Sequence, residues 1–314
     1  MSTFSFNVKD EVSRLESTKT ENIAELSAII RNSMEKTSNI LIQIENNSVA
    51  RRIYKLIKEL YGVTPIITVR KKYFNNGLSF ILEIKSKVNE ILTDLSIIDK
   101  NGDYLNIPKE FVISDDEEVR AYLRGIFVVN GSVNDPKTSR YHMEVSVDDI
   151  GYATFIKGLM DNYNLNAKII KRTKNYTVYI KEAEKISDFL RVIKAYNAVM
   201  YFEDIRIYRD HKNMTNRLNN CEQANVDKIF LTSNKQIKDI EKLISLDMVD
   251  LLDPKLQELI EYRLKYKESS MQELSDIISL ETGNKITKSG LNHRFRKIKE
   301  IVSNIEKKEL DEKK

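Results

Sequence analysis

A segment near the end of the chain, between Lys285 and Lys299, carries six basic side chains and no acidic one. The basic residues are Lys285, Lys288, Arg294, Arg296, Lys297 and Lys299. Asn292 stands among them. Arginine and asparagine are the side chains best suited to paired hydrogen bonds with guanine and adenine, and lysine neutralises phosphate. The chemistry that these residue types favour is therefore recognition of DNA.

The same segment has the apolar spacing of an amphipathic helix. Leu291, Phe295, Ile298 and Val302 recur at intervals of three and four residues, which places them on one inward face. The outward residues are then Lys288, Ser289, Asn292, Arg296 and Lys299, with His293, Arg294 and Lys297 on the flanks. Ser289 and the free N–H groups of the first turn are suited to phosphate. The alternative is a solvated basic helix whose charge is balanced by the acidic tail 306–312.

Two further helices are expected before the basic one. Asp253 followed by Pro254 predicts a helix start, because aspartate caps free N–H groups and proline fits the first helical position. Ser270 opens a capping box, and Gly283 predicts the end of that second helix. A short helix, a glycine-containing turn and a basic helix beginning near Thr287 are typical of a helix-turn-helix, whose second helix enters the major groove.

Upstream, two similar segments lie 97 positions apart: Leu26-Ser-Ala-Ile-Ile-Arg-Asn-Ser33 and Leu123-Arg-Gly-Ile-Phe-Val-Val-Asn130. Each opens the same predicted order of elements. In the first copy this is a helix from Glu21, strand 39–45, helix 48–61, strands 64–72 and 78–84 and helix 88–95. In the second it is helix 117–129, strand 141–147, helix 150–163, strands 167–172 and 176–180 and helix 183–196.

These patterns predict an α+β fold of two tandem pseudo-symmetric αββαββα repeats, followed by an all-α helix-turn-helix domain. The repeated helices are expected to cross at the centre, where Ala28 and Gly125 allow close approach. The predicted boundaries are 1–110 and 111–208 for the repeats, 209–225 for a polar linker and 226–314 for the helix-turn-helix domain. The alternative is a generic α+β repeat with an incidental glycine, but two motifs in register argue against coincidence.

Basic residues also gather at the equivalent hairpins of the two repeats. They are Arg70, Lys71 and Lys72 in the first copy and Lys168, Lys171, Arg172 and Lys174 in the second. The turn Asn75-Asn76-Gly77 predicts a tight hairpin in the first copy, because Asn and Gly tolerate positive φ. Such hairpins can contact phosphates, although an exposed basic hairpin is also a common solvated surface.

Composition limits the alternatives. No apolar run reaches the roughly 18 residues needed to cross a bilayer, and the start of the chain lacks the features of a signal peptide, so a cytoplasmic location without membrane contact is expected. One cysteine, Cys221, and the scattered His142, His211 and His293 do not make a tetrahedral zinc site. We therefore expect no metal and no cofactor. A net charge of +4 is too small to indicate a nucleic-acid partner by itself.

The two similar segments resemble the signature helix of the LAGLIDADG homing endonucleases. That signature ends in an acidic residue that binds the catalytic metal. The matching positions here are Ser33 and Asn130, which lack the charge that a hard cation requires. The resemblance thus implies a nuclease scaffold without its catalytic residues. The carboxylates near the motif ends are Glu35, Asp135 and Glu144, and an active endonuclease with displaced metal ligands remains the alternative.

A second resemblance covers nearly the whole chain. The segment 286–298 is similar to the C-terminal signature of the bacterial WhiA regulators. That family's second motif and the strand after it resemble the segments 122–127, 131–136 and 141–144 of this chain. Its linker resembles residues 219–225. The resemblance implies a degenerate homing-endonuclease domain joined to a helix-turn-helix, without nuclease activity. It further implies a nucleoid-associated regulator of cell division, chromosome segregation and, in spore formers, sporulation.

This reading expects double-stranded DNA as the main partner, with regulatory or division proteins as further partners. The N-terminal repeats would then supply additional DNA or protein contacts. A third reading makes those repeats a platform for protein interaction alone. In that case their removal would leave DNA affinity and its salt dependence unchanged, because no phosphate contact would be lost.

Overall fold

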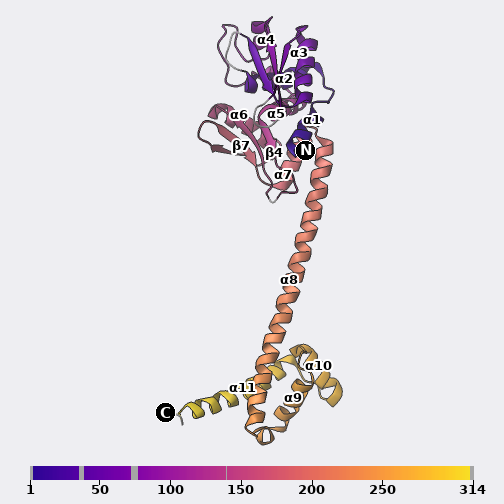
Figure 1. The fold of residues 1–314 in the computed structure, drawn as a ribbon, viewed down its shortest axis with the longest axis vertical. Coiled ribbons are helices and arrows are strands. Elements are labelled where there is room, and N and C mark those ends of the chain that lie inside the picture. Colours follow the sequence, from indigo (N-terminus) through magenta and orange to yellow (C-terminus); the bar gives the residue numbers. More distant parts are fainter. Residues whose placement is uncertain (1–2, 35–38, 72–76, 139, 312–314) are drawn as a thin grey trace. The chain divides into compact units, whose positions relative to one another are not determined.

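The computed structural model describes residues 3–34, 39–71, 77–138 and 140–311. The chain divides into two compact units, 1–210 and 211–314, which are described separately. Figure 1 shows the first as a mixture of helices and sheets and the second as helical throughout. Helix α8 (Tyr196–Ser245) begins in the first unit and ends in the second. No described helix, α8 included, is both long enough and apolar enough to cross a membrane.

The first unit contains every helix and strand predicted for the two repeats, with ends shifted by a few residues. The first repeat comprises α2 (Lys19–Ser33), β1 (Ile40–Ile44), α3 (Asn47–Tyr61), β2 (Ile66–Lys71), β3 (Leu78–Ile84) and α4 (Val88–Asp94). The second comprises α5 (Asp116–Asn130), β4 (Gly131–Val133), β5 (Met143–Val147), α6 (Ile150–Asp161), β6 (Lys168–Lys171), β7 (Tyr176–Ile180) and α7 (Ala183–Val192), and the short 3-10 helix η1 (Glu110–Val112) precedes it. The predicted hairpin residues Lys72, Asn75 and Asn76 lie outside the described residues.

Both repeats begin their motif helix in the same way. Thr18 caps α2 and forms a capping box with Glu21, and Asp115 caps α5 and forms a capping box with Glu118. Each box satisfies free N–H groups that a helix start leaves without partners. The repeated caps explain why two segments of different composition fold into equivalent helices.

Each repeat packs its helices on an antiparallel sheet. The first sheet has the order β1-β3-β2 and the second the order β4-β5-β7-β6. Strand β4, which was not predicted, pairs with β5 through Gly131 and Val145. The equivalent position of the first repeat forms only the isolated bridge Met34↔Ile42, after which residues 35–38 lie outside the described part. The αββαββα order is therefore complete in the second repeat, while the described residues of the first hold three strands.

Helices α2 and α5 cross closely, as the small residues predicted. A Cβ atom added at Gly125 would lie 2.8 Å from Ala28 Cβ and closer still to the backbone carbonyl oxygen of Glu25. At the far end of the pair, Asn130 Nδ2 donates to the backbone oxygen of Asn32 over 3.4 Å. The predicted meeting of Ala28 and Gly125 at the crossing is confirmed.

Replacing Gly125 with alanine should destabilise the first unit by about 1–3 kcal/mol, because the added methyl group meets backbone and not a flexible side chain. The matched control is Gly158→Ala on α6, where a Cβ would meet nothing within 4 Å. That control should gain up to about 1 kcal/mol from helix propensity. The check is the urea dependence of amide exchange in α2 and α5. Equal effects of the two substitutions would contradict the tight crossing.

An N-terminal helix that was not predicted, α1 (Phe4–Val12), completes the core of the first unit. Phe4, Val8 and Val12 recur every fourth residue and are buried. On its exposed side, the Glu11 carboxylate accepts hydrogen bonds from the backbone N–H groups of Asn197 and Ala198, over 2.7 and 3.0 Å. Helix α1 therefore caps the start of α8.

The segment 209–225, expected as a polar linker, is helical throughout and forms part of α8. Its side chains are almost all exposed. The sequence predicted a linker with some helical content, and the helix extends through the whole segment because Asn-rich composition lowers helix propensity only slightly per residue. The Glu11 carboxylate caps the first turn of α8, and Ile240 and Leu243 bury its last turns in the second unit. Both ends therefore favour a continuous helix over the whole length of α8.

The second unit packs the end of α8 with η2 (Val249–Leu251), α9 (Pro254–Lys265), α10 (Met271–Thr282) and α11 (Lys288–Asp311). Its core contains the predicted apolar stripe of α11, with Leu291, Phe295 and Ile298, packed against Leu259 of α9 and Leu274 of α10. The predicted caps are confirmed: Asp253 accepts from the N–H of Lys255, Ser270 forms its capping box, and Gly283 ends α10 with φ +70°.

Candidate nucleic-acid interface

The turn between α10 and α11 is fixed by hydroxyl groups. Ser275 Oγ donates to the backbone oxygen of Ile286 over 2.9 Å, and the Ile286 N–H donates to Ser279 Oγ over 3.0 Å. Thr287 Oγ1 then accepts from the N–H of Gly290 over 3.2 Å and caps α11. The turn covers residues 283–287. Side-chain hydrogen bonds therefore hold the residues of this turn in a defined conformation. Helix α11 begins one residue after the predicted start.

Helix α11 presents most of the predicted residues to solvent while its apolar stripe is buried. The exposed ones are Lys288, Ser289, Asn292, His293, Arg296, Lys297 and Lys299. The geometry therefore holds these polar side chains on a helix whose orientation is set by Leu291, Phe295 and Ile298. A rigid helix with polar residues at its start is the arrangement that major-groove recognition uses.

Arg294 lies apart from the others. Its Nη1 atom is 3.6 Å from Glu258 Oε2 and donates to the backbone oxygen of Lys255 over 3.4 Å. Only 20% of its side chain is exposed. The sequence placed Arg294 on a flank of α11, and the structure shows that this flank faces α9. Arg294 therefore joins two helices of the unit and does not share the exposed face.

Another arginine, Arg263, is buried and connects the helices of the second unit. Arg263 on α9 is 1% exposed, donates to the backbone oxygen of Ser269 over 2.8 Å, and lies over the Phe295 ring at 5.4 Å. Burial lowers the pKa of Arg263 from its usual value. By joining α9, the loop before α10 and the core side of α11, this residue holds the exposed face in place.

The exposed face of α11 adjoins a groove of about 750 Å³ against the end of α8. The α11 wall includes Ser289, Asn292, Arg296 and Lys299. The α8 wall includes Lys235 and Lys238, both exposed. These two lysines were not predicted from the sequence, because their part of α8 carries no recognisable motif. Their spacing of three residues, which puts them on one helical face, was the signal available.

The hairpin residues of the first unit are placed less uniformly. Arg70 and Lys71 are exposed on β2. Lys171 Nζ lies 6.0 Å from the centre of the Tyr176 ring, and Lys174 is exposed. Arg172 instead donates to Glu144 Oε2 over 2.7 Å. Lys168 on β6 is exposed as well. Five of the six described hairpin residues are therefore turned to solvent, and Arg172 already pairs with a carboxylate.

The ends of the two motif helices hold no converging carboxylates in the described part of the chain. Ser33 Oγ donates to the backbone oxygen of Ile29 over 2.6 Å, so its hydroxyl is hydrogen-bonded within the last turn of α2. Asp135 caps the turn at Lys137, and Glu144 accepts from His142 over 3.0 Å. Glu35 lies outside the described residues. Within residues 3–34, 39–71, 77–138 and 140–311, no group of three potential metal ligands is found.

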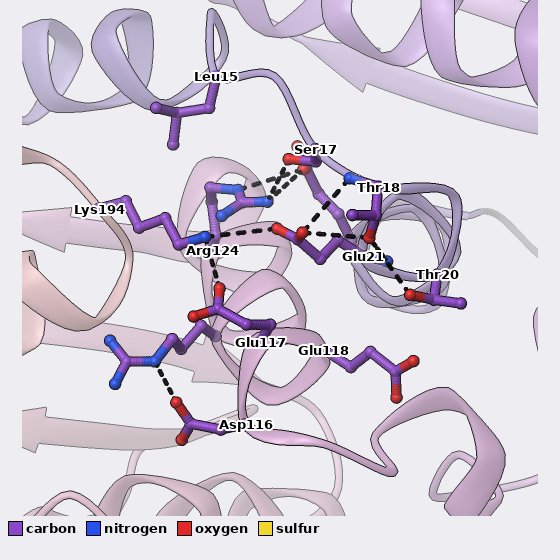
Figure 2. A network of polar contacts seen from close by, with 12 residues as sticks. Leu15, Ser17, Thr18, Thr20, Glu21, Asp116, Glu117, Glu118, Arg124 and Lys194 are labelled. Atoms are coloured by element: carbon purple, nitrogen blue, oxygen red, sulfur yellow. Dashed lines mark hydrogen bonds and ion pairs between the residues drawn. The ribbon is translucent and has the colours of Figure 1, made fainter.

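The opposite ends of the motif helices meet in a polar network, shown in Figure 2. Lys194 Nζ lies 3.5 Å from Glu21 Oε2 and 2.5 Å from Glu117 Oε2, so one ammonium joins the first turns of α2 and α5. The hydrogen bond to Glu117 raises the pKa of Lys194. Burial opposes the ionisation of Glu21, but hydrogen bonds from Thr18 and the charge of Lys194 outweigh it and lower its pKa. This network stabilises the helix pair.

Between these two ends, a carboxylate is buried at the crossing. Glu25 is 1% exposed and lies between two arginines. Its Oε2 atom is 3.0 Å from Arg52 Nη2 and 3.0 Å from Arg124 Nη2. Ser17 Oγ also accepts from Arg124 over 3.1 Å. The Glu25 carboxylate offsets one of the two positive charges inside the core. The triad connects α2, α3 and α5 and offers no exposed chemical group.

Together these features define a pair of LAGLIDADG-like repeats followed by a helix-turn-helix unit. The comparisons with known proteins agree. Sequence models of the WhiA N-terminal LAGLIDADG-like domain, the WhiA LAGLIDADG-like domain and the WhiA C-terminal HTH domain match residues 19–98, 119–212 and 215–302. The chain belongs to the WhiA family.

Relatives support this assignment over nearly the full length, and a solved structure shares the fold. Probable cell division protein WhiA of Staphylococcus saprophyticus is 43% identical over 308 residues, covering 96% of this chain and 97% of the relative. Its namesake in Ligilactobacillus salivarius is 42% identical, with 96% of each chain covered. The fold matches that of full-length DUF199/WhiA from Thermatoga maritima with a TM-score of 0.59 and 23% identity, covering 96% of this chain and 99% of that one.

Proposed function

We propose that this protein is a non-enzymatic, sequence-specific DNA-binding regulator of the WhiA type. It acts in cell division and chromosome segregation and, in a spore-forming host, in sporulation. The observation that carries the proposal is the exposed face of α11, where Asn292, Arg296 and Lys299 stand on a helix held by a buried core. Side chains so placed reach base edges and phosphates in the major groove.

The proposal includes a cytoplasmic, nucleoid-associated location and double-stranded DNA as the main partner, alongside other regulatory or division proteins. It keeps the domain boundaries 1–110, 111–208, 209–225 and 226–314, the third segment being a helical connection. Phosphate contacts of the first unit are assigned to the hairpin residues Arg70, Lys71, Lys72, Lys171, Arg172 and Lys174. Linking two DNA-contacting units in one chain raises their joint affinity through effective concentration.

A second candidate is a LAGLIDADG-type endonuclease with displaced metal ligands. The observation that favours it is the close crossing of the motif helices α2 and α5, because LAGLIDADG endonucleases are built from the same type of repeat. Against it stand Ser33 and Asn130 at the positions of the motif carboxylates. An uncharged hydroxyl and an amide bind a divalent cation far more weakly than carboxylates do.

One experiment separates the two candidates. Purified protein is incubated with fragmented bacterial genomic DNA in magnesium buffer, and both the retained fragments and their ends are sequenced. The regulator predicts enrichment of a few promoter regions with unchanged ends. New ends at a defined site would establish the endonuclease instead, and enrichment without any sequence preference would count against sequence-specific regulation.

A further inference from the structure

The last turns of α8 are built into the helix-turn-helix unit. Ile240 and Leu243 are fully buried in its core. Ser233, 3% exposed, donates through Oγ to the backbone oxygen of Lys267, and Gln236 Nε2 lies 3.4 Å from Met271 Sδ. These contacts fix the segment against the loop before α10. The α8 wall of the groove is therefore held in a defined position relative to α11.

The groove carries a strong positive charge. Lys235 and Lys238 line it from α8, and Arg296 and Lys299 line it from α11. Among the lining residues in the described part of the chain, Asp239 is the single carboxylate. Burial raises the pKa of that carboxyl. Within the described part of the chain, neither Lys235 nor Lys238 forms an ion pair or a side-chain hydrogen bond, so both ammonium groups are available to an anion.

The groove is also continuous with the face that would meet DNA. Ser289, Asn292 and Arg296 belong both to the outward face of α11 and to the groove wall. An anion bound in the groove would lie beside any bases contacted by Asn292. A duplex places a phosphate strand at each edge of its major groove, next to a bound recognition helix. The charge and the position of the groove therefore fit the DNA backbone.

We propose that Lys235 and Lys238 of α8 bind phosphates of the DNA strand bordering the major groove occupied by α11. This inference rests on the proposed function and extends it to the helix that joins the two units. Helix α8 then contributes directly to affinity, while α11 supplies sequence recognition. Because phosphate contacts carry no sequence information, the two lysines should strengthen binding to every sequence alike.

The test compares the full-length protein with the double variant Lys235→Gln, Lys238→Gln on two duplexes, one enriched from genomic DNA and one unrelated. Affinity is measured at several salt concentrations. Each lost phosphate contact should reduce the slope of log affinity against log salt by about 0.9, so the double variant should lose about 2 on both duplexes. Far-ultraviolet circular dichroism verifies that the helices are intact.

The matched control is the double variant Lys212→Gln, Lys228→Gln. Both residues are exposed on α8 but do not line the groove. The control should retain the wild-type slope. An unchanged slope in the groove variant, or an equal loss in the control, would overturn the inference while leaving the proposed function intact. Failure of the wild-type protein to bind either duplex would overturn both.

Discussion

Replacing Glu25 with glutamine should lower the free energy of unfolding of the first unit by about 3–5 kcal/mol. The substitution keeps the size of the side chain and removes its charge. Arg52 and Arg124 would then face each other in the core without a counter-charge, with 6% and 0% of their side chains exposed. Little water reaches these guanidinium groups, so hydration recovers little of the cost of burying their charge.

The measurement is the urea dependence of amide exchange in full-length protein, read from peptides of α2 and α5. Peptides of α11 report the second unit in the same sample and should not change. The control is Glu59→Gln, because Glu59 lies 3.7 Å from Lys55 in a pair whose side chains are about half exposed. That surface pair should cost no more than about 0.5 kcal/mol. A loss below 1 kcal/mol for Glu25→Gln would show that the triad is not energetically coupled.

Local chemistry explains why much of the fold was predictable from the sequence. The predicted helix caps at Asp253 and Ser270 and the stop at Gly283 act through backbone groups within a few residues, so their local patterns suffice. The crossing of α2 and α5 is a long-range contact, but it was predictable because the motif occurs twice and both copies carry a small residue at the same position.

Other features depend on contacts that no local pattern reveals. Helix α1 was missed although Phe4, Val8 and Val12 have helical spacing, because nine residues with three apolar positions give a weak signal. Strand β4 has three residues and exists only through its pairing with β5. The helical state of 209–225 is set by the units at both ends of α8, which local composition does not report.

The candidate DNA interface shows the same division. Periodicity correctly separated the inward and outward residues of α11, because helix geometry alone decides which side chains share a face. It did not reveal which flank meets a neighbouring helix. Arg294 is therefore held at α9 by Glu258, and the opposite flank borders the groove that contains Lys235 and Lys238. Only the packing of α8 and α9 around α11 distinguishes the two flanks.

Asn292→Ala and Arg296→Ala should each weaken binding to a preferred site by about 1–3 kcal/mol, or roughly 5- to 150-fold, if these side chains contact base edges. Both are exposed, lie one helical turn apart, and belong to the same wall of the groove. The double variant should lose about 2–6 kcal/mol if the two contacts are independent, and less if both read the same base pair. Binding to an unrelated duplex should change much less.

The ratio of the two affinities makes this prediction decisive, because it removes any loss shared by all sequences. Loss of a base contact lowers affinity for the preferred site and so reduces the ratio, whereas loss of a phosphate contact lowers both affinities and leaves the ratio unchanged. Lys307→Ala, exposed farther along α11, is the control and should change neither affinity by more than about 0.5 kcal/mol. Equal losses on both duplexes would reassign Asn292 and Arg296 to the backbone. Sequence recognition would then require other residues of α11, with His293 and Lys297 next to be tested because both are exposed beside them.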